Sequence, residues 1–578
     1  MLVAVLAGVL LMALPSYLLA QTVPPVPNAC QRFTAGSVVQ QPPALFSQNG
    51  VLNVQFSYQT TTDSVGRQLY CFMTPSGLQN PTLHVNPGDT LNITVTNNTP
   101  FSEVGDTDEK FNFPTCGDIE FEQQIGTDAQ GFAMSGGSMN IHYHGTNTTP
   151  QCHGDNVTKT LVNPGSTFHY SLQFPTDEPP GLYWYHPHVH GLAELALLGG
   201  ASGALVVDGI ENVQPAVQGL RQRILVFRDQ AQVDGLGEGG GNCGVDVPFQ
   251  DLTINNVPID SHQDPVTGNV TFTPAVLHME AGDTEFWRVT NSSADTILDL
   301  QVVYDGVPQN LSIVGIDAVP VNSQDGTGPG SLINNVTEYR LAVAGRVEFL
   351  VHAPVSTVKV AQLITNNINT GPQGDCDPTR AVFNISTGNF EPRVASAATS
   401  DNRLPASTGL RTDLRRFGGL RNSPVTATRT FQFSEIQPSQ FFITQTSAGQ
   451  TPMVFDNNNP PSVITTQGSV EHWNIQNIAQ ENHEFHQHQI HFLVLSQDNY
   501  ETNGNPHNAA MTGQFADMIE VPYWDNVANP NGPVPQAELL MDFRGPDIGD
   551  FVYHCHILSH EDLGMMAIER VCPSTGCH

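Results

Sequence analysis

The stretch Gly88-Asp-Thr-Leu-Asn-Ile-Thr-Val-Thr-Asn97 combines a tight turn with an alternating strand, and two later stretches repeat its pattern. The copies are Gly282-Asp-Thr-Glu-Phe-Trp-Arg-Val-Thr-Asn291 and Gly468-Ser-Val-Glu-His-Trp-Asn-Ile-Gln-Asn477. One copy in each domain-sized interval predicts three similar β-sandwich domains. We place these domains at 40–208, 220–385 and 425–578, with linkers after Val207-Asp208-Gly209 and near 388–425.

The composition agrees with an all-β chain of several domains. The 578 residues are too many for one hydrophobic core, and 51 Gly and 42 Pro indicate many turns. The formal net charge of 21 − 55 = −34 argues against nucleic acid or an anionic membrane as a partner, because both are also negative. Cations and small neutral organic molecules are better candidates, although acidity also simply keeps a secreted protein soluble.

The first 20 residues form an apolar run that ends at Ala20, which predicts a cleaved signal peptide at 1–20 and a secreted, extracellular protein. After cleavage we expect no membrane association. The run lacks a preceding basic residue and has Leu18 where a small residue is usual, so an uncleaved anchor is the alternative.

Cysteines and glycosylation motifs also favour an extracellular location. Cys555 stands between two histidines, which leaves eight other cysteines, an even number suited to disulfides whose pairing the sequence does not give. These are Cys30, Cys71, Cys116, Cys152, Cys243, Cys376, Cys572 and Cys577. Nine Asn-x-Ser/Thr motifs are typical of a glycoprotein. They start at Asn92, Asn97, Asn147, Asn156, Asn269, Asn291, Asn310, Asn335 and Asn384.

The 21 histidines are concentrated in the first and third domains. Seven lie between 142 and 190 and ten lie between 472 and 578, whereas the middle domain has only His262, His278 and His352. We therefore expect metal chemistry in the outer domains, with the middle domain as a spacer or part of a substrate wall.

Four motifs each contain a His-x-His pair. On a strand, residues i and i+2 project from the same face, so each pair can direct two imidazoles to one site. Four pairs supply eight imidazoles, the number that three copper ions with additional oxygen ligands require. The motifs are His142-Tyr-His144-Gly145, His186-Pro-His188-Val-His190-Gly191, His483-Glu-Phe-His486-Gln-His488 and His554-Cys555-His556-Ile-Leu-Ser-His560-Glu-Asp-Leu-Gly-Met565.

The same two-residue period separates a second site. Cys555 must point away from His554 and His556 on a regular strand, and His483 is an odd step from His486. With His560 and Met565, these residues supply one thiolate, two imidazoles and a thioether, which is the ligand set of a blue-copper electron-transfer centre. Zinc is the main inorganic alternative, but it cannot pass electrons and this is a poor zinc ligand set.

These motifs and the repeat resemble those of multicopper oxidases, the family of laccases, bilirubin oxidase and ascorbate oxidase. The resemblance implies three cupredoxin-like Greek-key β-sandwich domains and four copper ions: one type 1, one type 2 and a type 3 pair. It implies that His142 and His486 bind type 2 copper. The implied type 3 ligands are His144, His186, His188, His488, His554 and His556, and the implied type 1 ligands are His483, Cys555, His560 and, axially, Met565.

The resemblance also implies an electron route and a proton supply. Cys555 is covalently continuous with both neighbouring histidines and would connect the single copper to the three-copper cluster. Reduction of dioxygen to two waters consumes four protons. By analogy with the family, we propose Asp155 and Glu561 as the catalytic acids, with a solvated carboxylate as the alternative for each.

Some features depart from typical fungal laccases. Glu484 and Gln489 stand where proline and glycine are usual, and 101–140 is a long insert of undetermined role. His153, His190 and His491 lie close to the motifs, and we interpret them as hydrogen-bonding or packing residues rather than ligands.

The predicted function is laccase-like oxidation of phenols or aromatic amines, coupled to reduction of O2, at the exposed edge of His483 or His560. A metallo-oxidase acting on Fe(II) or Mn(II) is the alternative within enzymes, and it requires carboxylates beside type 1 copper. With only 12 Met and no Met-rich insert, Cu(I) is disfavoured as a substrate. A non-catalytic secreted copper-binding protein is the alternative from another class, although all twelve ligand positions are filled. The oligomeric state is undetermined.

Overall fold

The computed structural model describes residues 22–102, 127–128, 131–132, 134–232, 248–324, 330–387, 402–406, 415–437, 439–503 and 508–577. The chain is 45% strand and 6% helix, which confirms the all-β prediction. The expected signal peptide, Cys116, Cys243 and most of the 101–140 insert lie outside the described residues. Within these ranges, every helix is too short or too polar to span a membrane.

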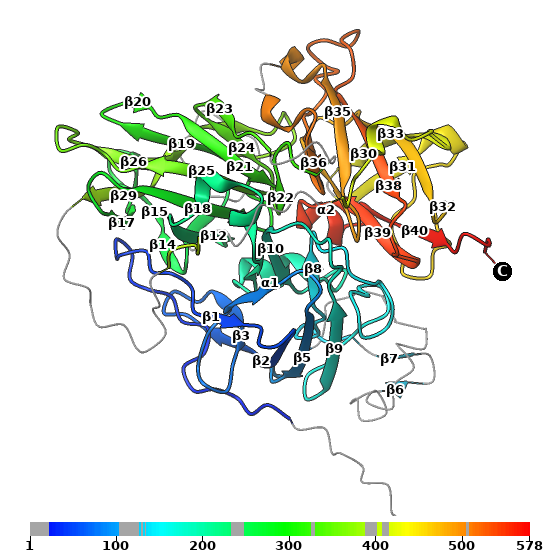
Figure 1. Ribbon diagram of the computed structural model, residues 1–578, viewed down its shortest axis with the longest axis horizontal. Helices are drawn as coiled ribbons and strands as arrows, with labels where there is room; N and C mark the ends of the chain where they lie inside the picture. Colours follow the sequence, from blue (N-terminus) through cyan, green and yellow to red (C-terminus); the bar gives the residue numbers. More distant parts are fainter. Residues whose placement is uncertain are drawn as a thin grey trace, which may run out of the picture.

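The strands form three successive pairs of sheets, drawn in Figure 1 from blue through green to red. In the first pair, one sheet has the order β1 (Ala44–Phe46), β4 (Thr82–Val85), β11 (Gly203–Val207), β10 (Gly181–His186) and β8 (His142–His144). The other has the order β3 (Gln68–Met73), β2 (Val51–Thr62), β5 (Thr90–Asn97) and β9 (Thr167–Gln173).

The second pair lies between 221 and 387. One sheet has the order β14 (Val257–Ile259), β13 (Asp251–Ile254), β12 (Arg221–Gln230), β18 (Thr284–Asn291), β25 (Arg346–His352), β21 (Leu311–Ile316) and β22 (Val319–Pro320), with β23 (Ile333–Val336) beside β21. The other has the order β17 (Ala275–Met279), β29 (Arg380–Thr387), β26 (Ala361–Thr365), β19 (Leu298–Tyr304) and β20 (Val307–Pro308), with β24 (Tyr339–Leu341) beside β19.

The third pair lies between 427 and 572. One sheet has the order β31 (Gln440–Gln445), β30 (Ala427–Ile436), β33 (Ser469–Asn477), β38 (Gln536–Phe543), β35 (Phe492–Asp498) and β36 (Phe515–Ala516). The other has the order β32 (Val463–Thr466), β40 (Met566–Cys572), β39 (Gly549–Cys555), β34 (His483–Gln487) and β37 (Met518–Val521).

The remaining elements are short. The described residues contain two α-helices, α1 (Ala193–Leu198) and α2 (Leu558–Asp562). Three two-stranded ribbons are β6 (Thr127–Asp128) with β7 (Gly131–Phe132), β15 (Ser261–Gln263) with β16 (Val270–Phe272), and β27 (Ile368–Asn369) with β28 (Cys376–Asp377). The 3-10 turns are η2 (Ile210–Asn212), η3 (Pro215–Val217), η4 (Leu420–Asn422), η5 (Thr446–Ala448), η6 (Tyr500–Asn503) and η7 (Ala509–Met511).

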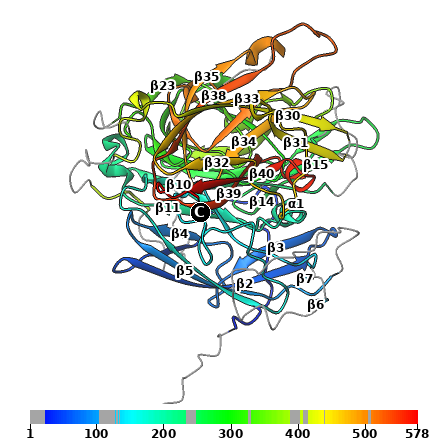
Figure 2. The ribbon, with the colours of Figure 1, turned by 90° about the vertical axis from the view of Figure 1, so that its right-hand side faces the viewer.

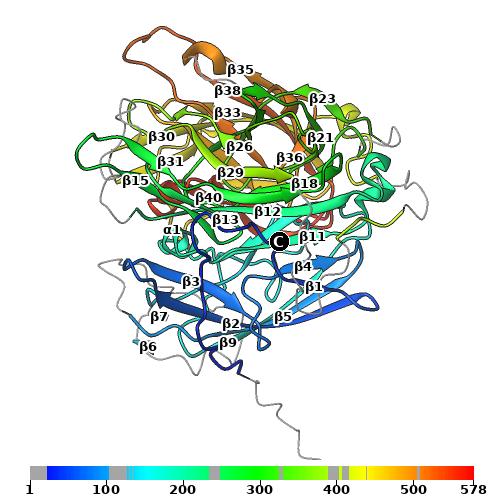
Figure 3. The same cartoon turned by 90° about the vertical axis from the view of Figure 1, so that its left-hand side faces the viewer.

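The three repeated stretches occupy equivalent places. β5, β18 and β33 each pair in parallel with one neighbour and antiparallel with the other: β2 and β9, β12 and β25, and β30 and β38, respectively. The repeat in the sequence is therefore a repeat of sheet topology. Figures 2 and 3 show the first pair on one side of the molecule and the other two pairs across from it.

The last asparagine of each repeat ties loops to the sheet. Asn97 donates to the carbonyl groups of Gly137 and Val162, at 2.7 and 2.8 Å. Asn291 and Asn477 are likewise fully buried and donate to carbonyl groups of adjacent loops. A buried amide that satisfies several carbonyls is costly to replace, because each carbonyl would lose its partner.

This burial corrects part of the glycosylation hypothesis. Asn97, Asn147 and Asn291 begin three of the nine motifs, and all three are at most 2% exposed. Their amides are used for internal hydrogen bonds, so a glycan does not fit there in the folded protein. The other six asparagines are half-buried or exposed.

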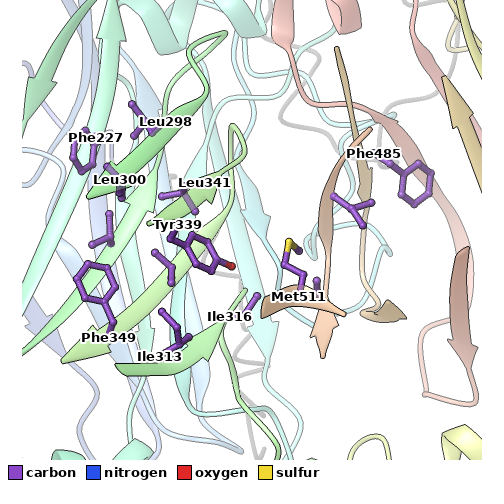
Figure 4. Packing of buried hydrophobic residues seen from close by; sticks show 14 of the residues in the cluster. Phe227, Leu298, Leu300, Ile313, Ile316, Tyr339, Leu341, Phe349, Phe485 and Met511 are labelled. Carbon is purple, nitrogen blue, oxygen red and sulfur yellow. The ribbon is translucent and has the colours of Figure 1, made fainter. Parts of the chain in front are cut away.

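The second and third sheet pairs contribute to one continuous hydrophobic cluster, part of which appears in Figure 4. Phe349 of the second pair and Phe485 of the third belong to this cluster, whereas Phe56 and Tyr143 belong to a separate cluster in the first pair. Disulfides join Cys30 to Cys71 and Cys572 to Cys577, and Cys376 is also disulfide-bonded.

Candidate metal centre

The first two histidine motifs lie on adjacent antiparallel strands. β10 pairs with β8 so that His186 is opposite His142 and Trp184 is opposite His144. His188 follows β10, and its backbone N–H donates to Asn140 Oδ1 at 2.7 Å. The sheet register therefore brings both motifs to one edge of the first sheet pair.

The third and fourth motifs are arranged in the same way. β34 pairs with β39 so that His486 is opposite His554 and Phe485 is opposite Cys555. Because side chains alternate along a strand, Cys555 and His554 project from opposite faces. β8, β10, β39 and α2 lie where the three groups of strands meet in Figure 1.

The imidazoles of three different motifs meet at His554, which is one of the three. Its Nε2 lies 3.2 Å from Nε2 of His188 and 3.1 Å from Nε2 of His488. His142, His144 and His486 form a second group, with ligand nitrogens within 4.8 Å of one another.

His186 and His556 complete the set of eight. The His556 ring lies 5.0 Å from that of His144 and 5.5 Å from that of His186. All eight side chains are at most 1% exposed. The structure thus brings together, from two sheet pairs, every histidine that the resemblance assigns to the three-copper cluster.

The chemistry of these side chains fits metal ions. Within the described residues, the Nε2 atoms of His142, His186 and His486 and both ring nitrogens of His556 are buried without a hydrogen-bond partner, an arrangement that is costly unless a metal satisfies them. Burial, followed by neighbouring imidazoles, holds the pKa of His142 and His556 well below the usual value. Neutral imidazoles have the free lone pair that copper requires.

Cys555 forms a separate triangle with two histidines. Nδ1 of His483 lies 3.1 Å from Nδ1 of His560, and Cys555 Sγ lies 3.7 Å and 3.8 Å from these atoms. The point equidistant from the three atoms is about 2.1 Å from each, within the range of metal bonds to histidine and cysteine. The predicted type 1 ligands therefore enclose a space of suitable size.

Met565 is brought back to this triangle by the turn that contains α2. The Cys555 N–H donates to the Met565 carbonyl, and the Met565 N–H donates to the His560 carbonyl, both at 3.0 Å. Met565 is fully buried.

Asp155 contacts one imidazole of the eight-histidine site. Both carboxylate oxygens lie 3.0 Å from Nδ1 of His142, and burial raises the pKa of Asp155 to about 8. Gln489 donates to the same carboxylate at 2.8 Å and has a positive φ of 58°. Gln489, which stands where glycine is usual, therefore adds a hydrogen bond to Asp155.

Glu561 lies against two further imidazoles. Its carboxylate oxygens are 3.5 Å from Nδ1 of His188 and 3.3 Å from Nδ1 of His554. Burial, together with Asp562, raises the pKa of Glu561 well above the usual value. The adjacent Asp562 accepts hydrogen bonds from backbone N–H groups at and just after the end of the second motif, including that of Gly191 at 2.7 Å.

The histidines interpreted as non-ligands have hydrogen-bonding or packing contacts. Nδ1 of His153 lies 2.6 Å from the His169 carbonyl, and Nε2 of His491 lies 3.0 Å from the Asp317 carbonyl. His190 packs edge-on against Phe455 and lies near Glu561.

Sequence reasoning missed a buried pair beside the eight-histidine site. Arg346, from the middle sheet pair, forms an ion pair with Asp517, and Arg346 Nη1 lies 3.1 Å from Nδ1 of His144. Neither residue is in a motif, so the sequence held no signal for them. The middle domain therefore contributes one side chain to the surroundings of the eight-histidine site.

Sequence reasoning also missed carboxylates on the outer side of the Cys555 triangle. Glu481 Oε1 lies 3.3 Å from Nε2 of His560, and Glu435 Oε2 lies 3.8 Å from Nε2 of His483. Asp375 is near both Glu481 and His560, and burial, followed by the charge of Glu481, raises its pKa to about 8. These side chains come from separate segments, so only the fold brings them together.

Comparisons with known proteins agree with this architecture. Residues 134–212 and 423–573 match sequence models described as multicopper oxidase. A laccase from Bacillus stratosphericus is 33% identical over 133 residues, which are 21% of this chain and only 25% of that laccase. The matched part thus spans about a quarter of this curated relative.

Solved structures show the same fold over nearly the whole chain. The McoA multicopper oxidase of Aquifex aeolicus has a TM-score of 0.61 at 18% identity, covering 93% of this chain and 100% of that one. A multicopper oxidase from Campylobacter jejuni, described as a metallo-oxidase, has a TM-score of 0.58 at 19% identity, covering 94% and 96%. Both histidine-bearing regions therefore match the multicopper oxidase family, and the chain as a whole shares the fold of solved multicopper oxidases.

Proposed function

We propose that this protein is a secreted, laccase-like oxidase that couples one-electron oxidation of a small reducing substrate to reduction of O2 to water. The observation that carries the proposal is the arrangement of β39. Cys555 faces the His483 and His560 triangle, while the adjacent His554 joins His188 and His488. Four bound copper ions would supply one-electron transfer at the triangle and the four-electron reduction of O2 at the eight-histidine site.

The chain itself provides the route between the two sites. The main chain joins Cys555 directly to His554 and His556, so electrons need no mobile carrier. Four one-electron oxidations reduce one O2, and four protons complete two waters. Asp155 and Glu561 contact the imidazoles of this site, where a buried carboxylic acid can hold and deliver a proton.

The exposed histidine edge expected from the sequence is not found, because His483 is fully buried and His560 is 4% exposed; the electron donor would approach the outer side of His560. Phenols and aromatic amines are the donors expected of a laccase-like enzyme. Phe441 stacks on the His560 ring at 4.3 Å and is itself buried.

A metal ion such as Fe(II) or Mn(II) is the second candidate donor. Glu481 and Glu435 approach the outer nitrogens of the two triangle histidines, and carboxylate oxygens are ligands that such cations accept. His560 is only 4% exposed, which suits a small cation better than a bulky ring. A metallo-oxidase requires carboxylates beside type 1 copper, and Glu481 and Glu435 meet this requirement.

The test uses copper-loaded protein and oxygen uptake with a panel of phenols, Fe(II) and Mn(II). Phenol turnover supports the laccase-like proposal, whereas turnover of metal ions alone identifies Fe(II) or Mn(II) as the substrate. Cys555→Ser is the control, and we expect it to lose the blue thiolate absorption and all turnover while the fold persists. Copper binding without oxygen uptake for any donor would favour the non-catalytic alternative.

A further inference from the structure

Arg346 is a buried charge at the start of β25, in the sheet pair that holds none of the four motifs. Its side chain is fully buried. Nη1 donates to Asp517 Oδ1 at 2.6 Å, and Nη2 donates to Asp517 Oδ2. Asp517 immediately precedes β37, so this two-pronged ion pair joins the middle sheet pair to the third.

The same guanidinium also reaches the first sheet pair. Its Nε donates to the Leu182 carbonyl on β10 at 3.3 Å, and its Nη1 lies 3.1 Å from Nδ1 of His144 on β8. One side chain therefore contacts all three sheet pairs at the point where the histidine motifs meet.

Asp517 extends this contact to a motif of the third sheet pair. Nδ1 of His486 donates to the Asp517 backbone carbonyl at 2.9 Å. The Asp517 carboxylate Oδ1 lies 3.6 Å and 3.7 Å from Nδ1 of His144 and His486. The hydrogen bond to the carbonyl fixes the orientation of the His486 ring, and the carboxylate adds an ionic contact to both rings.

The glycine that ends the first motif shows how closely the pair is packed. Gly145 has a φ of 83°, and a Cβ at this position would collide with Arg346 Nη2 and lie 2.6 Å from Asp517 Oδ2. The ion pair thus occupies the space that a side chain after His144 would need.

We propose that Arg346 is a positioning residue that acts through Asp517 to orient His144 and His486, so that the middle domain is an active part of the oxygen-reducing site. The inference rests on the proposed copper chemistry. The contacts predict that removing the guanidinium leaves the Asp517 carboxylate without its partner beside His144 and His486, while the Cys555 triangle is unaffected.

Arg288 and Glu348 provide a matched control. They form an ion pair at 2.5 Å on β18 and β25, each at 0% exposure, and Arg288 also donates to Gln222. Arg288→Met removes the same kind of buried pair from the same sheet. Loss of stability alone would be similar in the two variants.

The experiment compares copper-loaded Arg346→Met, Arg288→Met and unaltered protein by metal analysis and electron paramagnetic resonance. For Arg346→Met we expect loss of about one copper of four and of the type 2 signal, with the blue absorption retained. Arg288→Met should keep all the copper and an unchanged signal. Full copper content with an unchanged type 2 signal in Arg346→Met would overturn the inference.

Asp517→Asn is the second variant, in case Arg346→Met is insoluble. It keeps the backbone carbonyl that His486 uses and removes only the charge that pairs with Arg346. Loss of the type 2 signal with an intact blue absorption supports the inference, and an unchanged spectrum refutes it. Failure of the unaltered protein to bind copper would instead refute the proposed function, so the two hypotheses fail separately.

Discussion

The backbone N–H of Glu484 donates a hydrogen bond to Cys555 Sγ at 3.4 Å. Proline, which is usual at this position in the resembled laccases, has no N–H to donate. A hydrogen bond to the thiolate stabilises the more negative sulfur and raises the reduction potential of a copper bound there.

Glu484→Pro therefore should lower the type 1 reduction potential. One hydrogen bond to a charged group contributes about 1.5 kcal/mol, which corresponds to about 65 mV for one electron. Redox titration of the blue absorption measures this shift. Glu484→Gln keeps the N–H and serves as the control; equal potentials in the two variants would contradict the role of this hydrogen bond.

Glu481→Gln tests whether the carboxylates beside His560 bind a cationic donor. Losing one charge from the site should lower kcat/KM for Fe(II) or Mn(II) about tenfold, equivalent to about 1.4 kcal/mol, and leave phenol oxidation within about twofold. Oxygen uptake with each donor is the measurement. Glu280→Gln, which alters an exposed carboxylate paired with Arg221, is the control. Equal losses for both classes of donor would argue against a cation site.

Glu561→Gln should slow the reduction of O2 while leaving reduction of the blue centre unchanged. An amide fills the same space between His188 and His554 but cannot release a proton, and a positioned acid contributes about 100-fold or more. Stopped-flow reoxidation of the fully reduced protein isolates this step. A reoxidation rate equal to that of the unaltered protein would remove Glu561 from the proton supply.

Asn291→Ala should destabilise the middle domain by about 2–4 kcal/mol, because at least two buried carbonyl groups lose their donor. Urea unfolding followed by tryptophan fluorescence measures the change. Asn384 also begins a glycosylation motif in this domain but is exposed, and Asn384→Ala should change the free energy of unfolding by less than about 1 kcal/mol. Equal effects would refute the structural role assigned to Asn291.

The carboxyl group of Asp547 should make the free energy of unfolding depend on pH. Burial raises the pKa of this carboxyl to about 7 even though Arg416 opposes the shift. Because the folded pKa exceeds the unfolded one, this group favours folding below about pH 4, and that contribution is lost as the pH rises to about 7.

Asp547→Asn should therefore flatten the decline in stability between pH 4 and pH 7 by up to about 4 kcal/mol. The free energy of urea unfolding, measured across this range for both proteins, gives the difference directly. Parallel curves would show that Asp547 does not carry this dependence.

The sequence by itself determined the features that follow from local backbone geometry. The alternation of side chains along a strand predicted that Cys555 and His554 project from different faces and that His483 and His486 serve different sites. The repeat ending in Asn97, Asn291 and Asn477 indicated recurring β-sandwiches. Such patterns depend only on neighbouring residues, so no knowledge of the packing was needed.

The tertiary structure alone decided which distant side chains meet. Arg346 reaches His144 across some 200 positions of the chain, and Glu435 reaches His483 from another strand. These contacts depend on how twisted sheets pack and on which loops they bring together, and no residue period encodes that. The sequence did not indicate that the middle domain contributes to the site, because a single arginine forms no motif. The contacts of Arg346 exist only where the three sheet pairs meet.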